Sequence, residues 1–170
     1  FWGNATNGLD TRATLVWREG KDGDDGHYEL NGIKSFCSGA TGSDMLNITA
    51  PRSADPADRV FLSIPTARDG VNVLDDWDNL GQRQTDSGSV TFEKVRVEAH
   101  EVLGPPGTSG TPRATLRTLV SQLILIEIYI GNAQGALLNA WKYTHEQGRP
   151  WFTSGVARAI DDPFTQQHYG

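Results

Sequence analysis

The stretch LNGIKSFCSGA, residues 30–40, decides the fold of this sequence. Leu30 and Ile33 are spaced like inward-facing strand residues on either side of the pair Asn31-Gly32. Asn-Gly is the strongest short signal for a tight reversal between two strands. The sequence therefore predicts a hairpin here, whose second strand runs into the small residues Ser-Gly-Ala.

The end of that second predicted strand suits a flat ligand. Gly39 and Ala40 are small enough to let a ligand approach the backbone closely. The Ser38 hydroxyl can hydrogen-bond a ring nitrogen while Phe36 packs nearby, an arrangement that fits a flavin ring. The alternative is an ordinary hairpin of a β-domain in which Ser38 only ends a strand. The residues alone leave both interpretations open.

Charge and cysteine content narrow the possible functions. The net charge is −6, with both signs mixed along the chain, so the sequence predicts neither a nucleic-acid partner nor a membrane anchor. A single cysteine, Cys37, excludes an internal disulfide and fits a reducing compartment, so we expect a cytoplasmic protein. The chain begins with Phe1 and ends inside a predicted helix, from which we expect a fragment of a longer protein.

Strand signals fill the first part of the chain, up to about Gly104. Strand-like segments recur between Gly, Pro and Asp clusters at residues 13–19, 27–37, 45–50, 60–65, 71–74 and 89–97. In the last of these, the alternation of apolar and polar residues shifts phase at Lys94, which indicates a β-bulge. Regularly spaced short strands are typical of an antiparallel barrel or sandwich.

Helix signals follow a connector rich in Pro, Gly and Ser, residues 105–111. Thr111 and Pro112 suit an N-cap and a first helical position, and no proline interrupts residues 113–147. A helix of that length would approach ~50 Å. A membrane span and, over residues 123–130, a strand are the alternatives. Polar residues interrupt the apolar run, so we expect a bundle helix.

A second helix is predicted from Asp162 as N-cap and Pro163 as first helical position.

Four segments in this order resemble the acyl-CoA dehydrogenase superfamily and cover nearly all 170 residues. They are FWGNATNGLD (1–10), GHYELNGIKSFCSGATGSD (26–44), DDWDNLGQRQTDSGSVTFEKVRVEAHEVLG (75–104) and YTHEQGRPW (143–151). The resemblance implies an α+β chain in two parts. Residues 1–108 would form the middle antiparallel β-barrel domain, and residues 109–170 would start the C-terminal four-helix bundle with its first long helix.

Within that superfamily, the segments FWGNA, FCSGA, DDW, RQTDSGS and RPW resemble the dibenzothiophene monooxygenase-like flavin-dependent monooxygenases. This resemblance implies reduced FMN, supplied by a separate flavin reductase, with FAD as the alternative cofactor. It also implies oxygenation of a small sulfur- or nitrogen-containing substrate through a flavin peroxide, and a homotetramer. The departures from the dehydrogenase pattern are Asn4 in place of an acid, Leu9 in place of a serine, and Phe36-Cys37-Ser38 in place of Trp-Ile-Thr.

The resemblance assigns catalytic roles to Asn4 and Ser38. Ser38 matches the dehydrogenase threonine and would hydrogen-bond the flavin near its reactive nitrogen. The amide of Asn4 would bind the peroxide or the substrate heteroatom, unless it only holds its own loop together. The loop at residues 5–12 would then be a lid that becomes ordered with flavin or substrate.

The predicted cofactor contacts are Phe36, Ser38, Trp77, Ser87, Ser89 and Arg149. Trp77 would pack against flavin or substrate, or else be a core aromatic of the barrel. Ser87 and Ser89 would hydrogen-bond the flavin phosphate. Arg149 would contact the phosphate of a flavin in a neighbouring subunit, or else be an exposed cation at a helix end.

Two further readings stay open at this point. A true acyl-CoA dehydrogenase and a non-catalytic flavin- or acyl-binding relative would share these segments. The four histidines are dispersed without metal-ligand spacing, so we predict no metal site. The isolated 170 residues are expected to be poorly stable and inactive, because the long apolar helix lacks bundle partners.

Overall fold

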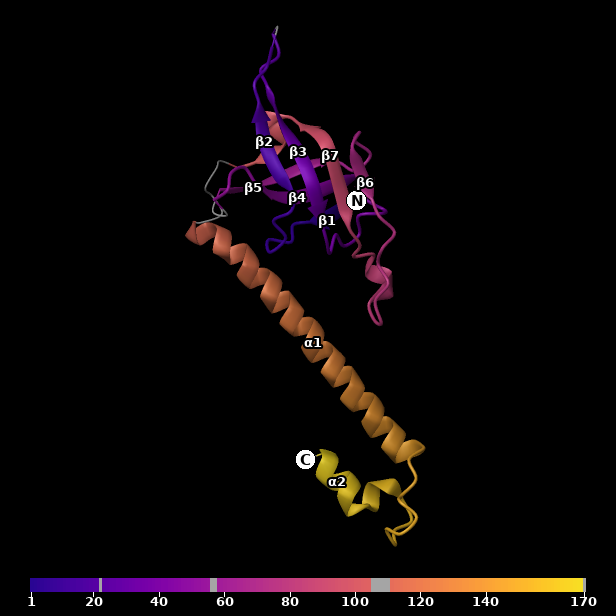
Figure 1. Cartoon of the computed structure of the whole chain (residues 1–170). Coiled ribbons are helices and arrows are strands. Elements are labelled where there is room, and N and C mark those ends of the chain that lie inside the picture. The colour runs from indigo at the N-terminus through magenta and orange to yellow at the C-terminus, as the bar shows by residue number, and fades with distance from the viewer. Residues whose placement is uncertain (22, 56–57, 105–110, 170) are drawn as a thin grey trace. The chain divides into compact units, whose positions relative to one another are not determined.

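A computed structural model describes residues 1–21, 23–55, 58–104 and 111–169 of the chain. It contains two compact units, Phe1–Thr115 and Leu116–Gly170. The predicted boundary between residues 108 and 109, and most of the predicted connector, lie outside the described residues. The first unit contains the strands and the second contains most of the helical residues (Figure 1).

The strand unit is built from two four-stranded sheets (Figure 1). The strands are β1 (Trp2–Ala5), β2 (Thr14–Arg18), β3 (His27–Lys34), β4 (Met45–Pro51), β5 (Arg59–Pro65), β6 (Val71–Val73), β7 (Val90–Val97) and β8 (Val102–Leu103). One sheet has the order β1-β4-β5-β8 and the other the order β2-β3-β7-β6. Short 3₁₀ turns, Arg83–Thr85 and Ala99–Glu101, lie before and after β7.

The core is made by the alternate residues of both sheets. One cluster of apolar side chains, each at most 1% exposed, fills the space between the sheets. It includes Leu15, Leu30, Leu46, Ile48, Leu62, Ile64, Val95 and Val97. Period-2 alternation in the sequence marked these positions because a strand points successive side chains to opposite faces. The expected fold, an acyl-CoA dehydrogenase-type β domain followed by a long helix, is confirmed.

The sequence analysis did not predict strands β1 and β8. β1 pairs with β4 in parallel, with Asn4 opposite Asn47. The expectation of a wholly antiparallel domain is therefore wrong for this pair of strands. The parallel pairing puts Gly3 and Ala5 on the buried side and leaves Asn4 exposed. β8 has only two residues, too few to show a period.

The hairpin predicted at Asn31-Gly32 is wrong. Residues 27–34 form one continuous strand, β3, which pairs with both β2 and β7. Asn31 uses its side-chain oxygen to accept the backbone N–H of Lys94 at 2.7 Å instead of forming a turn. Gly32 has φ +118°, and a Cβ there would lie 2.1 Å from the carbonyl oxygen of Arg12. The Asn-Gly pair therefore serves a close strand crossing rather than a reversal.

The β-bulge predicted at Lys94 is confirmed. Leu30 pairs with Val95 and Gly32 pairs with Phe92, so two residues of β7 face the single residue between them on β3. Lys94 itself has φ +49°, a left-handed conformation that non-glycine residues seldom adopt. A bulge bends the strand that carries it and increases its twist.

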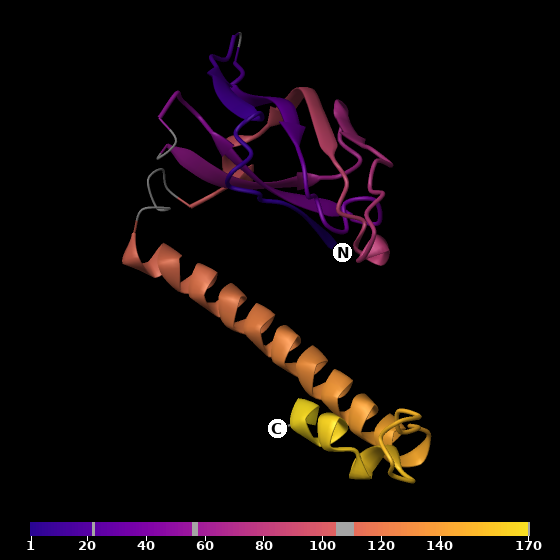
Figure 2. The ribbon, with the colours of Figure 1, turned by 60° about the horizontal axis from the view of Figure 1, so that its bottom comes forward.

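The helical unit is dominated by α1 (Pro112–Glu146), which starts at the predicted proline and is helical throughout residues 123–130. A 3₁₀ turn (Ala159–Asp161) precedes α2 (Pro163–Tyr169). Asp162 caps α2 as predicted, because its side chain accepts the N–H of Phe164 at 2.9 Å. Figure 2 shows α1 as a single unbroken rod.

The apolar side chains of α1 are uncovered within the described residues. Leu123 is 61% exposed and Ile124 is 57% exposed. By length and composition alone, residues Thr118–Glu146 could cross a membrane, although a core helix of a water-soluble fold passes the same test.

Candidate active site

The chain that leaves β3 folds back against the segment before β7. The N–H of Cys37 donates to the carbonyl oxygen of Gly88 at 2.8 Å, and the N–H of Gly39 donates to that of Asp86 at 3.0 Å. Phe36, just before these two contacts, adopts φ +58°, a left-handed conformation that turns the backbone sharply. Residues from two distant parts of the sequence thus form one surface around Ser38.

Three hydroxyl groups are connected at this surface. The Oγ atoms of Ser38 and Ser87 lie 2.7 Å apart, and Ser87 Oγ lies 2.8 Å from Thr85 Oγ1. Ser38 is exposed whereas Ser87 is only 8% exposed. The predicted site residue Ser38 is therefore accessible to a ligand and is supported from behind by a buried hydroxyl group.

Asn4 lies directly beside Ser38. Its backbone N–H donates to the carbonyl oxygen of Ser38 at 3.1 Å. Its side-chain Oδ1 accepts the N–H of Thr6 at 2.9 Å and the Thr6 hydroxyl at 2.5 Å. The alternative role of holding its own loop therefore occupies the amide oxygen. Among the described residues, Nδ2 has no hydrogen-bond partner, so the amide nitrogen is free to donate to a ligand.

Two aromatic residues flank the hydroxyl groups. Phe36 is 59% exposed, and its ring meets that of Trp77 edge to face, with centroids 6.1 Å apart. Trp77 is half-buried and donates its indole N–H to the carbonyl oxygen of Gln82 at 2.9 Å. The alternative of a core aromatic is wrong, because Trp77 lies outside the buried cluster of the strand unit. The pair instead presents an apolar surface beside Ser38.

The structure disfavours the phosphate contacts predicted for Ser87 and Ser89. Ser87 is buried, and its hydroxyl is engaged by two other hydroxyl groups. The backbone N–H of Ser89 donates to Asp76 Oδ1 at 2.7 Å, and hydrogen bonds from the Ser89 side chain and backbone lower the pKa of Asp76. An ionised carboxylate at this position would repel a phosphate. These two serines therefore hold the loops of the site together.

The predicted lid, residues 5–12, is anchored by side chains that the sequence analysis missed. Lys34, 1% exposed, donates through Nζ to the carbonyl oxygens of Asn7 at 2.7 Å and Asp10 at 2.6 Å. The Asp10 carboxylate accepts hydrogen bonds from Arg12 and from Ser35. Hydrogen bonding by Arg12 holds the pKa of Asp10 well below its usual range. These contacts hold the loop in place, so its role as a lid remains a prediction.

Cys37 is buried beneath the site. Burial raises the pKa of its thiol to about 11, so the thiol stays protonated at neutral pH. Cys37 therefore packs in the core and is not a nucleophile. Across the part of the chain that the structure describes, no group of three or more His, Cys, Asp or Glu side chains could hold a metal ion.

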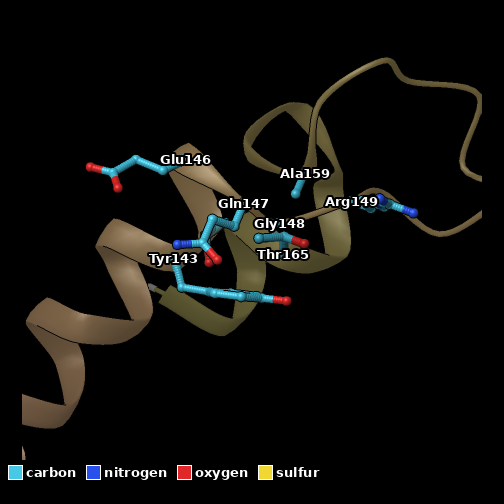
Figure 3. Close-up of a pocket in the computed structure, with 8 residues that line it drawn as sticks. Tyr143, Glu146, Gln147, Gly148, Arg149, Ala159 and Thr165 are labelled. Carbon is cyan, nitrogen blue, oxygen red and sulfur yellow. The ribbon is translucent and has the colours of Figure 1, made fainter.

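Arg149 belongs to the helical unit, in the loop after α1. It borders a pocket of about 790 Å³ that Tyr143, Gln147, Gly148 and Thr165 also line (Figure 3). Glu146 and Arg149 point away from each other in this view. No carboxylate of the described residues forms an ion pair with Arg149, so its guanidinium group is available to an anion.

Comparison with known proteins identifies the architecture. Residues 4–95 match the model of the acyl-CoA dehydrogenase middle domain. The chain belongs to the acyl-CoA dehydrogenase family. Within this family, the matched residues include the hydroxyl groups and aromatic rings around Ser38, together with Asn4 and the loop that Lys34 anchors.

Two proteins that are similar to the whole chain are monooxygenases by name. The chain is 46% identical over its whole length to a probable FMNH2-dependent monooxygenase, SfnC, of Pseudomonas putida, and covers 42% of that protein. It is 40% identical to the dibenzothiophene monooxygenase of Rhodococcus erythropolis and covers 43% of it. The chain thus spans less than half the length of these relatives.

A solved structure matches both the strand part and the helical part of the chain. The FMN-bound structure of TdsC from Paenibacillus sp. A11-2 matches 100% of this chain, with 42% identity and a TM-score of 0.83, and the chain covers 44% of it. Because the match includes α1, this helix is a helix of the family fold and not a membrane span.

Proposed function

We propose that the protein containing this chain is a reduced-FMN-dependent monooxygenase. Its substrate would be a small organic molecule that carries sulfur or nitrogen, and a separate flavin reductase would supply the reduced FMN. The observation that carries the proposal is the similarity over the whole chain to FMN-bound TdsC, at 42% identity. The name FMNH2-dependent monooxygenase, borne by a relative that is 46% identical, supports the same activity and favours FMN over FAD.

The surface around Ser38 fits a flavin ring. Phe36 and Trp77 offer an apolar edge against which a ring can pack, and Ser38 offers an exposed hydroxyl group beside them. Gly39 keeps the adjacent backbone open, since a Cβ there would meet only the ring of Phe1, at 3.1 Å. A flat, heteroatom-rich ligand needs this combination of an apolar edge and a single polar contact.

Reduced FMN, when bound, supplies the electrons with which oxygen is activated. Ser38 would hydrogen-bond the flavin ring and fix its orientation. Asn4 would donate from Nδ2 to the activated oxygen or to the heteroatom of the substrate, where a preorganised donor stabilises developing negative charge. The amide is preorganised because Thr6 already holds its oxygen.

Arg149 is our candidate for the phosphate of FMN. Its guanidinium can bind a phosphate through two parallel hydrogen bonds. We propose that it does so for FMN bound by a neighbouring subunit of a homotetramer. The single cysteine is the ground for placing this enzyme in the cytoplasm.

The test uses the full-length protein, loaded anaerobically with reduced FMN and mixed with oxygenated buffer. We expect a slow kinetic phase whose spectrum is neither that of reduced nor that of oxidised FMN. Ser38→Ala and Asn4→Ala should shorten this phase by tenfold or more, because each removes a hydrogen bond to the reacting groups. Thr66→Val is the matched control, since the Thr66 hydroxyl lies 2.7 Å from that of Ser43 and bonds to neither Ser38 nor Asn4.

Two other outcomes would overturn the proposal. Direct reoxidation, together with bleaching of bound oxidised flavin by an acyl-CoA, would identify a dehydrogenase. Failure to bind FMN or FAD would identify a non-catalytic relative.

A further inference from the structure

The hydroxyl groups behind Ser38 form a chain that ends on a backbone carbonyl. Ser38 Oγ lies 2.7 Å from Ser87 Oγ, and Ser87 Oγ lies 2.8 Å from Thr85 Oγ1. Thr85 Oγ1 in turn lies 2.9 Å from the carbonyl oxygen of Gln82. The chain therefore has three oxygen–oxygen contacts and three hydroxyl hydrogens.

Only one arrangement of these hydrogens satisfies all three contacts. A carbonyl oxygen only accepts, so the hydrogen between Thr85 and Gln82 must come from Thr85. The contact between Ser87 and Thr85 then requires the hydrogen of Ser87, and the contact between Ser38 and Ser87 requires the hydrogen of Ser38. Ser38 consequently donates inward and presents only lone pairs to a ligand.

The surrounding structure fixes this direction. Gln82 has φ +52° and its carbonyl oxygen also accepts the indole N–H of Trp77 at 2.9 Å, so the end of the chain is held in place. Ser87, in the middle, is 8% exposed and is largely shielded from water that could offer another partner. The N–H of Gly39, next to Ser38, donates to the carbonyl oxygen of Thr85 at 3.2 Å, which keeps the first and last hydroxyl groups of the series close to each other.

We propose that this directed chain makes the site selective for the reduced form of the flavin. The inference rests on the proposed function, in which Ser38 faces the reactive ring nitrogen. That nitrogen carries a hydrogen in the reduced flavin and a bare lone pair in the oxidised flavin. An outward-facing acceptor forms a hydrogen bond with the first and a repulsive contact with the second. Ser87 and Thr85 are thus positioning residues for the redox state of the ligand.

The test measures equilibrium binding of reduced and oxidised FMN to the full-length protein under anaerobic conditions. The wild-type protein should bind reduced FMN at least tenfold more tightly than oxidised FMN. Ser87→Ala removes the inward acceptor, so the hydrogen of Ser38 can turn toward the ligand. The ratio of the two affinities should then fall about tenfold, chiefly because oxidised FMN binds better.

The midpoint potential of bound FMN gives an independent measure of the same ratio. Tighter binding of the reduced form raises the potential, so a tenfold loss in Ser87→Ala should lower it by about 30 mV for a two-electron couple. Thr85→Val should shift the ratio in the same direction, because Ser87 loses its acceptor and can donate to Ser38 instead. Thr85 is exposed, so this variant tests the proposal even if Ser87→Ala fails to fold.

Two control variants distinguish loss of the hydroxyl series from a general destabilisation of the protein. Thr85→Ser keeps the hydroxyl group and should retain the wild-type ratio. Thr66→Val removes a hydroxyl from the Ser43–Thr66 pair and should also retain it. An unchanged ratio in both Ser87→Ala and Thr85→Val would overturn the inference and leave the proposed function standing. Absence of FMN binding by the wild-type protein would overturn both.

Discussion

The two units of this chain bury their apolar side chains to very different extents. In the strand unit, Leu30 and Val95 are fully buried in a continuous cluster between two sheets. In the helical unit, Leu123 and Leu138 are 61% and 67% exposed. Since burial of apolar surface is the main favourable contribution to folding, the strand unit contains its own source of stability and the helical unit does not.

This difference indicates which unit needs further helices to be stable. The chain covers 42% of a curated relative, so more than half of such a protein lies outside it. An exposed apolar helix 35 residues long is stable in water only when other helices cover it. The expected poor stability of the isolated chain therefore applies to the helical unit.

The largest expected effect compares one leucine from each unit. In the 170-residue chain, Leu30→Ala should lower the free energy of unfolding of the strand unit by about 2–5 kcal/mol, because it leaves a cavity in a packed core. Leu123→Ala should change it by less than about 0.5 kcal/mol, as expected for a surface substitution. Urea denaturation followed by near-ultraviolet circular dichroism measures both. Equal losses would contradict the comparison.

A smaller effect is expected when an ion pair with a buried carboxylate is compared with one whose carboxylate is exposed. The side chain of Asp10 is 5% exposed, and its bond with Arg12 depresses its pKa. The ionised Asp10 carboxylate therefore contributes fully to the free energy of unfolding above the unfolded pKa of about 4. This contribution is lost as the pH falls below that value. Asp10→Asn should cost about 2 kcal/mol at pH 7 and flatten the pH dependence of stability below pH ~4.

Asp161 provides the matched control for that measurement. It bonds to Arg158 at the surface, with the two side chains 43% and 67% exposed. Asp161→Asn should leave the stability of the strand unit and its acid limb unchanged. Thermal melts from pH 2.5 to 7 compare the variants, and a pH dependence that persists in Asp10→Asn would refute the assignment.

The smallest effects are expected from one substitution in each unit that changes the conformational cost of the backbone. Lys94→Gly should stabilise the strand unit by about 0.5–1 kcal/mol, because glycine adopts φ +49° without strain. Gly131→Ala should instead raise the helix content of the helical unit, since nothing lies within 4 Å of a Cβ built there. Chemical denaturation checks the first change and circular dichroism at 222 nm checks the second. Loss of stability in Lys94→Gly would show that the lysine side chain matters more than the strain.

Local patterns predicted most of the fold and only part of the site. The strands from 13 to 97 and the long helix followed from alternation and from the absence of proline. The hairpin prediction was wrong because the Asn31 side chain accepts a hydrogen bond from the N–H of Lys94. Lys94 is distant in sequence, so a local pattern cannot predict this contact. β1 was missed because its four residues find their partner strand only in the folded protein.

The site shows the same division between local and distant information. The exposed hydroxyl of Ser38 could be expected from its place after a strand. Its connection to Ser87 depends on two loops that meet only in the folded state. Lys34 was missed because lysines are rarely buried, and no short motif marks one that binds two backbone carbonyls.

The parallel pairing of β1 with β4 has a consequence for the order of folding. During synthesis Trp2–Ala5 emerges before its partner residues, which begin with Met45. A contact between residues so distant in sequence forms slowly, because a long loop must close before the strands can pair. β1 also occupies the edge of its sheet, so the other strands can assemble without it. We therefore expect Asn4 to reach Ser38 late in folding, so that the proposed site is complete only after the rest of the sheet has formed.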